Sequence, residues 1–311
     1  MSDPAAEPGV PNDGATNVPA AGEKSIAAEV KQRVPGRVVS LASTPDRIIL
    51  RINKLLANPG GLSAFLSTLN YTLYLLAFAS AKTAPLQARL SALLSKATGR
   101  PATAILAGGV APEARILALA GLFSSARVTM RLFGLFPMYA WMRQLLQGPK
   151  PGQDQILYAT SFTQCSLYMM FQFLENVALL TDHAVLPTSY TEKYLVKSPA
   201  PGAKPTSKIY LWAYRAWFAG VLCDVVKLAR EAQLESSKRS ERGEKGVTTR
   251  SADEAVDKKW WSDAVVPAAW TPVAAQFSVE GGFGWFNLGI MGACGMLAGL
   301  SRTASLWAET A

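Results

Sequence analysis

Apolar residues recur at helical spacing over most of the chain, beginning with a short basic segment near residue 44. Thr44 suits a helix N-cap, and Pro45 suits the first helical position. At about 100° per residue, one narrow sector holds the basic side chains Arg47, Arg51 and Lys54, whereas the apolar side chains Ile48, Ile52 and Leu55 lie away from it. The pattern predicts a basic amphipathic helix that ends near residues 58–61. It either packs on a core with a solvated basic face or lies on a membrane surface.

The next apolar stretch, residues 62–81, has 20 residues and no charge. This length can span a bilayer of about 30 Å. Its several Ser, Thr and Asn side chains favour a buried or interfacial helix instead. A further helix is expected over residues 86–97, followed by a turn.

A longer helix is predicted from Pro112 to Phe136, where Pro137 should kink or end it. One narrow face of this helix collects Ala120, Ser124, Arg127, Arg131 and Gly134, and bulky apolar residues cover the remainder. Such a helix could lie deep in the lipid headgroup region, with the arginines reaching phosphates. The alternative is a core helix whose arginine pair faces carboxylates.

In the second half of the chain, predicted apolar helices alternate with polar segments that are expected to be exposed to solvent. Residues 156–180 contain 19 uncharged residues before Glu175. Residues 181–207 read as a proline-rich linker. In the helix expected from Lys208 to about Leu234, three charged residues argue against full insertion: Arg215, Asp224 and Lys227. Residues 236–259 carry mixed charges, typical of a loop or a solvated helix extension.

The clearest membrane signal lies near the C-terminus. Residues 281–300 are uncharged and include seven glycines, which allow membrane helices to approach closely. We expect a transmembrane helix there, packed through Gly295 and Gly299, and then a short tail over residues 302–311. Residues 1–43 have the composition of a disordered tail without a secretory signal.

Composition agrees with an all-α, membrane-associated protein that carries amphipathic helices and a C-terminal transmembrane helix. Half of the residues are hydrophobic and 17% are charged, below the usual quarter or so. The net charge of +9 arises within residues 1–150, which hold 16 basic and 7 acidic residues. This asymmetry indicates an anionic partner. An anionic membrane surface fits better than nucleic acid, because the basic residues alternate with Leu, Ile and Phe and not with base-stacking residues.

Residues that carry catalytic or metal chemistry are sparse. The three cysteines stand far apart, and His183 is the only histidine, so neither a disulfide framework nor a metal site is indicated. No phosphate-binding loop, nucleophile elbow or dinucleotide fingerprint occurs. We therefore expect no catalytic residues, no cofactor and no enzymatic activity.

Four segments together resemble the peroxin-eleven family (peroxisomal biogenesis factor eleven), in particular its divergent fungal branch. They are "DRIILRINKLL", "GGLSAFLSTLNYTLYLLA", "SSARVTMRLFGL" and the glycine-rich stretch near the C-terminus. The likeness covers about residues 44–180 and 208–301. It implies a helical peroxisomal membrane protein that inserts amphipathic helices into the cytosolic leaflet, self-associates and promotes peroxisome elongation, proliferation and fission.

The resemblance also implies partners and positions. The partners would be anionic membrane lipids, further copies of the chain, and possible contacts with the peroxisomal import receptor and the fission machinery. Residues 44–180 would form the remodelling region. By position, Arg115 joins the insertion helix. The membrane-binding residues expected from pattern and resemblance together are Arg47, Arg51, Lys54, Arg115, Phe123, Arg127, Arg131, Leu132, Phe133 and Phe136.

Two other functions compete with membrane remodelling. A channel or transporter for small metabolites in the peroxisomal membrane would need several true spans and a polar lumen. The candidate lumen residues are Asn70, Gln164, Gln172, Glu175 and Asn176. A soluble helical adaptor is the third reading.

Overall fold

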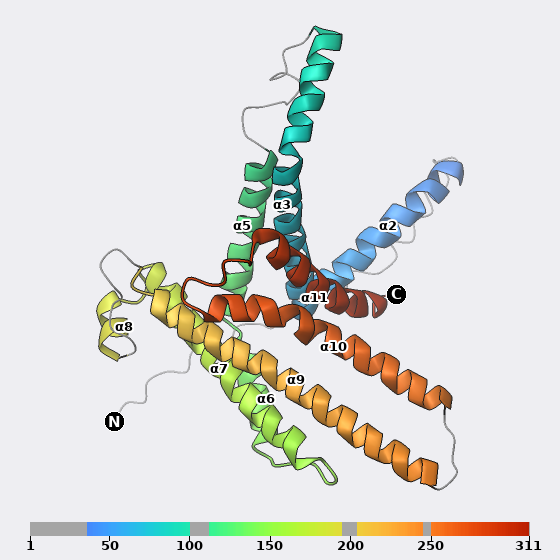
Figure 1. Cartoon of the computed structure of the whole chain (residues 1–311), viewed down its shortest axis with the longest axis vertical. Helices are drawn as coiled ribbons and strands as arrows, with labels where there is room; N and C mark the ends of the chain where they lie inside the picture. The colour runs from blue at the N-terminus through green and yellow to red at the C-terminus, as the bar shows by residue number, and fades with distance from the viewer. Residues whose placement is uncertain (1–35, 100–111, 195–203, 245–249, 311) are drawn as a thin grey trace, which may run out of the picture. The chain divides into compact units, whose positions relative to one another are not determined.

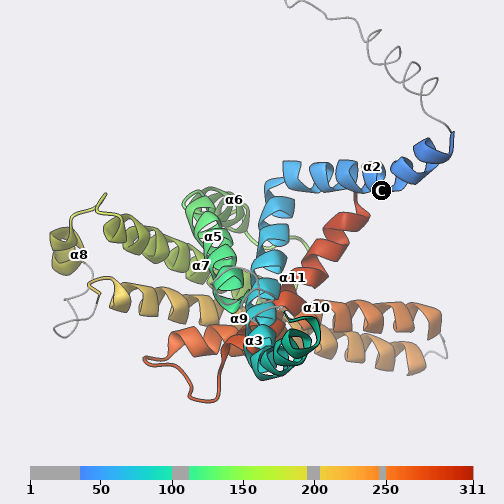
Figure 2. The ribbon, with the colours of Figure 1, turned by 90° about the horizontal axis from the view of Figure 1, so that it is seen from above.

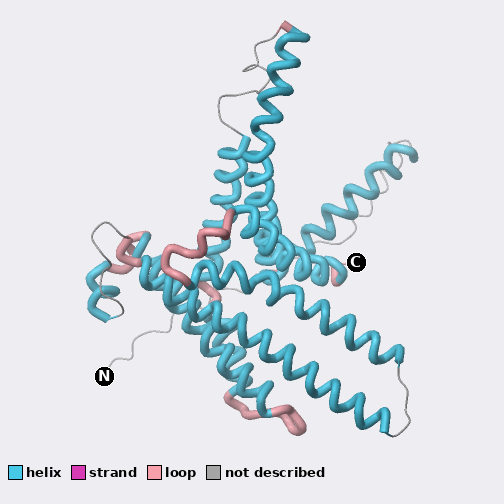
Figure 3. The backbone as a smooth tube through the Cα atoms, viewed as in Figure 1, coloured by secondary structure: helices cyan, strands magenta, loops and turns pink. Residues whose placement is uncertain are grey.

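A computed structural model describes residues 36–99, 112–194, 204–244 and 250–310, which form helices joined by loops, with no strand among them (Figures 1 and 3). The predicted all-α fold is therefore confirmed. The helices are α2 Gly36–Ala57, α3 Pro59–Thr98, α5 Pro112–Arg131, α6 Leu135–Leu145, α7 Gln155–Asp182, α8 Thr188–Tyr194, α9 Ser207–Glu244, α10 Arg250–Ser278 and α11 Leu288–Ala308.

The chain divides into two units, residues 1–54 and residues 55–311. The described part of the first unit is helix α2, which begins at Gly36 and contains Pro45 in its interior. The predicted start at Thr44 is thus eight residues late. The preceding residues "VVSLAS" continue the helical apolar pattern, and an internal proline costs a helix one backbone hydrogen bond without always ending it. The rest of the predicted tail, residues 1–35, lies outside the described residues.

The second unit contains two groups of helices. Helices α3, α5 and α11 pack together in one group, while α7 lies along α9 in the other and also contacts α6 and α8. Helix α10 contacts both α9 and α11, so it joins the two groups (Figure 2). The two helices predicted over residues 62–81 and 86–97 form one continuous helix, α3, which is capped at its start by the Asn58 side chain.

Glycines set the contact between α3 and α11. A Cβ atom at Gly295 would lie 2.2 Å from the Tyr71 ring, and one at Gly299 would lie 2.7 Å from the Thr68 hydroxyl. Both glycines are buried, and the hydroxyls of Thr68 and Thr303 are 2.9 Å apart across the same contact. The two glycines expected to pack therefore lie where two helices meet within one chain.

The predicted C-terminal span differs from the structure. Residues 281–287 form a turn in which Gly281 and Gly282 have positive φ angles, and α11 starts only at Leu288. The helix then continues through Arg302 into the predicted tail. Its apolar part is consequently shorter than the uncharged stretch in the sequence, because seven of those 20 residues are not helical.

Two helical segments of the described chain are long and apolar enough to cross a membrane, namely 59–83 and 207–243. The helices over 113–131 and 135–145 would add a third span if they cross as one bent pair. The second segment includes the helix from Lys208 to about Leu234, for which the charged residues argued against full membrane insertion. Its internal charges have partners: Arg215 donates to the Ser278 carbonyl at 3.1 Å, and Asp224 accepts from Gln164 at 2.7 Å.

The break between α5 and α6 falls at residues 132–134 and not at Pro137. The two helices are bent by 45° at this break. Pro137 lies in the first turn of α6, where a missing N–H group leaves no bond unmade. The carbonyl of Leu132, freed by the break, accepts a hydrogen bond of 3.0 Å from the Asn176 side chain of α7. A partner helix thus satisfies the backbone at the bend.

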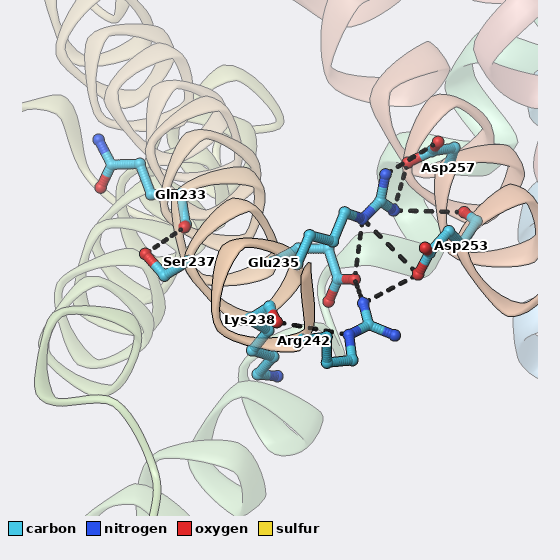
Figure 4. Close-up of polar contacts among 8 residues, drawn as sticks. Gln233, Glu235, Ser237, Lys238, Arg242, Asp253 and Asp257 are labelled. Atoms are coloured by element: carbon cyan, nitrogen blue, oxygen red, sulfur yellow. Dashed lines mark hydrogen bonds and ion pairs between the residues drawn. The ribbon is translucent and has the colours of Figure 1, made fainter. Parts of the chain in front are cut away.

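The predicted linker and charged loop are more ordered than expected. Residues 188–194 form helix α8 inside the linker, of which 195–203 lie outside the described residues. The charged segment supplies the ends of α9 and α10, and its residues 245–249 are not described. These two ends are joined by ion pairs, with Arg242 lying between Glu235 and Asp253 at 3.1 and 2.8 Å (Figure 4).

Replacing Gly295 by valine should destabilise the protein by about 1–3 kcal/mol, because the new side chain overlaps the Tyr71 ring in a closely packed contact. Denaturation of the purified full chain in detergent, followed by circular dichroism, measures this change. Gly121→Ala is the matched control, since a Cβ atom at Gly121 meets nothing within 4 Å. Equal stability of the two variants would contradict the close α3–α11 contact.

Candidate functional site

The narrow basic face of α5 points into the bundle. Arg131 donates two hydrogen bonds of 2.8 Å to the carboxylate of Glu175 on α7. Glu175 is 2% exposed, so its charge is separated from solvent and depends on this arginine. A two-pronged guanidinium–carboxylate pair has favourable geometry, and it links the α3–α5–α11 group to α7.

The other members of this face are also directed inward. Arg127 lies over the Tyr71 ring of α3, 5.3 Å from its centre, and Ala120 is fully buried. A Cβ atom at Gly134 would lie 2.4 Å from the Gln172 side chain of α7. The structure therefore directs Arg127 and Arg131 toward other helices, although the Arg131 side chain is still 34% exposed. The membrane-insertion prediction placed both arginines against lipid headgroups. Their arrangement matches the alternative in which an arginine faces a carboxylate.

Several bulky apolar side chains of α5, α6 and the break between them point outward. Leu122 is 64% exposed, Phe133 66% and Phe136 73%. A water-soluble helix places its apolar face on the core and its charges in solvent, and this helix has the opposite arrangement. An outward apolar face with inward charges is the arrangement expected of a protein in contact with lipid.

The remaining predicted membrane residues have mixed positions. Arg115 is exposed on the first turns of α5, while Phe123 and Leu132 are half-buried. In the first unit, Arg47 and Lys54 are exposed and Arg51 is half-buried. Next to them on α2, Ile48, Ile49 and Leu50 are all exposed. Helix α2 thus presents basic and apolar side chains along its described length.

A cavity of about 420 Å³ lies among α3, α5, α7, α9, α10 and α11. Its polar lining comes from Arg127, Arg131, Glu175, Asn70 and Ser124, and aromatic rings from four helices supply most of the remainder. Asn70 is 2% exposed, and its side-chain oxygen has no hydrogen-bond partner. The cavity is therefore a partly open site that is lined by aromatic side chains and contains an incompletely satisfied polar group.

The polar residues considered for a channel lumen are mostly bonded to one another or to backbone. The Gln164 amide donates to Asp224 and to the Gly220 carbonyl, at 2.7 and 2.9 Å, and its oxygen accepts from Lys227. Gln172 donates to Asn176 at 2.8 Å. The Gln164 bonds hold α7 against α9, whereas the Gln172 bond lies within α7. Asn70 and Glu175 are therefore the lumen candidates that line the cavity.

Sequence reasoning missed the role of Glu175 as the partner of Arg131. The signal was present, because Glu175 follows 19 uncharged residues, and a lone charge in an apolar helix requires a partner. The partner itself could not be read from spacing, since the two residues are 44 positions apart and on different helices. In the described part of the chain, no group of three or more His, Cys, Asp or Glu side chains is placed to hold a metal ion.

Asp154 caps the start of α7 and also contacts α9. Its carboxylate accepts hydrogen bonds of 3.0 Å from the backbone N–H groups of Ile156 and Leu157, and it pairs with Arg230 at 2.8 Å. The hydrogen bond from Arg230, with help from the helix start, lowers the pKa of Asp154 below its ordinary value of 3.8.

Arg131→Gln should destabilise the protein by about 3 kcal/mol, because Glu175, which is 2% exposed, then stays buried and unpaired. Glu175→Gln should cost less, because the Arg131 side chain that it leaves unpaired is 34% exposed. The double variant Arg131→Leu with Glu175→Leu should recover most of that loss, since no charge then remains to be satisfied. Denaturation in detergent measures both effects. Arg143→Gln, at an exposed position on α6, is the control. Additive losses in the double variant would contradict the pairing.

Acid should weaken the α7–α9 connection. Because the pKa of Asp154 is lower in the folded than in the unfolded protein, its contribution is complete above pH 3.8 and is lost as the pH falls through the folded value. Asp154→Asn should therefore reduce stability at neutral pH and flatten the decline of stability below pH 3.8. Unfolding as a function of pH measures this. Gln147→Asn, which changes an exposed residue without a titratable side chain, should leave the wild-type pH profile unchanged.

One comparison with known proteins finds a match. The family model described as "Peroxisomal biogenesis factor 11 (PEX11)" matches residues 111–307, well over half of the chain, whereas α2 and α3 precede the matched region. No curated protein and no solved structure matches the chain significantly. Proteins of this family are peroxisomal membrane proteins, and the family is one of peroxisome biogenesis factors that is not known as enzymatic. The chain therefore belongs to the PEX11 family and is a peroxisomal membrane protein with a role in peroxisome biogenesis.

Proposed function

We propose that this protein promotes the elongation, proliferation and fission of peroxisomes by inserting helices into one leaflet of the membrane and by self-associating. The observation that carries the proposal is the arrangement of the α5–α6 region in a member of a peroxisomal membrane family: Leu122, Phe133 and Phe136 are exposed, whereas Arg131 is paired with Glu175 between helices. A helix that occupies one leaflet expands it relative to the other leaflet and favours curvature.

Helix α2 is the best candidate for the inserting element. Arg47, Arg51 and Lys54 can contact anionic headgroups, while Ile48 and Ile49 enter the acyl region. Each basic residue near an anionic surface contributes about 1 kcal/mol. The contribution of three such residues is therefore comparable to that of burying one or two apolar side chains.

The outer face of α5 and α6 supplies a second apolar surface. Phe133 and Phe136 are among the most exposed large apolar side chains of the described chain, and Arg115 lies exposed near the other end of α5. In this proposal Arg127 and Arg131 hold the bundle together and do not touch lipid. The aromatic side chains near the bend would anchor it at lipid depth.

Self-association and further partners complete the proposal. Curvature over an organelle requires many copies of a small wedge, and α9 exposes Trp212, Leu222, Val225 and Val226, which a second copy or lipid could cover. Contacts with the import receptor and the fission machinery belong to the same proposal. Helix α9 is also apolar enough to cross the bilayer, so lipid and protein would compete for this surface.

The channel hypothesis has less support from the geometry. A lumen needs polar groups that are available to solutes, whereas Gln164, Gln172 and Asn176 are bonded to other groups of the bundle. Polar groups that bond to one another stabilise helix packing and are not available to a solute. Membrane remodelling is therefore the function that we propose.

The double variant Arg47→Glu with Ile49→Asp should reduce binding of the full chain to vesicles that contain phosphatidylserine, and should shorten peroxisomes in cells that overproduce it. The physical reason is the loss of one headgroup contact, together with the placement of a charge in the acyl region. Flotation of the purified protein and imaging of a matrix marker measure the two effects. We expect a loss of vesicle binding of about tenfold or more.

The matched control is Arg250→Glu with Val256→Asp, which makes the same changes at exposed positions of α10. This control should retain vesicle binding and elongation. If the α2 variant still elongates peroxisomes to the wild-type extent, α2 is not the inserting helix. If neither loss nor excess of the protein changes peroxisome shape, the remodelling proposal itself is wrong.

A further inference from the structure

The cavity inside the bundle has a charge that the protein does not neutralise. Arg131 is paired with Glu175. Arg127, by contrast, has no carboxylate partner among the described residues, and it contacts the uncharged side chain of Tyr71. The acidic lining is limited to Glu175, whose two oxygens already accept from Arg131. The cavity is therefore left with the positive charge of Arg127.

A second group in the cavity is also unsatisfied. Asn70 is almost completely buried on α3, and its side-chain oxygen accepts no hydrogen bond. A buried acceptor without a donor is rare and unfavourable in folded proteins. It becomes favourable when a bound molecule supplies an O–H or N–H group. Both unsatisfied residues line the same cavity.

The aromatic side chains that line the cavity indicate which kind of molecule would fit it. Trp217, Trp270, Tyr74 and Phe171 are among the aromatic side chains that surround the polar groups, and Trp217 lies against Trp270 with ring centres 5.7 Å apart. The volume of about 420 Å³ is within the range of about 300–1,000 Å³ typical of small-molecule sites. Such walls suit an apolar or aromatic body.

We propose that this cavity binds an amphiphilic anion, with its carboxylate or phosphate group against Arg127, a hydrogen-bond donor on Asn70 and its apolar body between the aromatic walls. The site is separate from the outer surface used for membrane insertion, so the inference does not rest on the proposed function. The cavity adjoins six helices from both groups of the bundle. Occupancy should therefore stabilise the packed arrangement of the helices.

The test uses the full chain in phosphatidylcholine nanodiscs and the fluorescent probe dansylglycine. This probe carries a carboxylate, an N–H donor close to it and an aromatic body, and it accepts energy from nearby tryptophans. Dansylamide, which lacks the carboxylate, is the matched control ligand. We expect dansylglycine to bind about tenfold more tightly than dansylamide, as for a charge-assisted hydrogen bond. Equal binding of the two probes would overturn the proposal.

Two variants test whether the probes bind in this cavity. Arg127→Gln should remove the preference for dansylglycine over dansylamide, and Asn70→Leu should weaken the binding of both probes. Asn70→Leu should also raise the unfolding temperature of the empty protein, because it removes the unsatisfied acceptor. Lys258→Gln, at an exposed position of α10, should change neither property. If Arg127→Gln still prefers dansylglycine, the assignment of the acid group to Arg127 is wrong. If Arg127→Gln fails to fold, Asn70→Leu tests the site independently, and unchanged binding of both probes to that variant would contradict the proposal.

Competition identifies the source of the anion. If the natural ligand is a lipid, phosphatidic acid in the nanodisc should displace dansylglycine from the wild-type protein. If it is a soluble compound, phenyl phosphate in the buffer should displace the probe while phosphatidic acid does not. Either displacement supports an anion site at Arg127. Failure of both competitors would show that the probe does not bind through its acid group, and would overturn the proposal.

Discussion

The ion pair between Arg131 and Glu175 is the constraint on which the rest of the bundle depends. Glu175 is buried in α7, and an unpaired buried carboxylate is strongly unfavourable. The pair therefore fixes the rotation of α5 so that its basic face points inward. Once that rotation is fixed, Leu122, Phe133 and Phe136 point outward. The outward position of these apolar side chains thus follows from the need to pair the buried carboxylate of Glu175.

Reversed polarity also explains how the helices can be both charged and apolar. Polar side chains are satisfied between helices, as in the contact of Gln164 with Asp224 and in the bond from Asn176 to the carbonyl at the α5–α6 bend. Small residues then allow helices to approach closely without relying on the hydrophobic effect between them. Gly295 and Gly299 serve this purpose between α11 and α3. These features agree with membership of a peroxisomal membrane family.

The glycine-rich segment shows how composition can misplace a span. Residues 281–300 are uncharged, yet the first seven of them form a turn that uses the positive φ angles available to glycine. Glycine both permits close helix packing and breaks helices, and composition does not distinguish the two uses. The segments long and apolar enough to cross a membrane lie instead in α3 and α9. In α9, partner groups bond to Arg215 and Asp224, two of the charged residues that had argued against insertion.

The sequence by itself determined the all-α class, the faces of α5 and the basic amphipathic character of α2, because helical periodicity follows from local spacing. It also carried the family resemblance that the match over residues 111–307 confirms. Only the tertiary structure decided which face of α5 points inward and which polar groups remain unsatisfied in the cavity. Periodicity gives the angle between two faces of a helix, but the partner of each face is set by residues far away in the chain, such as Glu175 for Arg131.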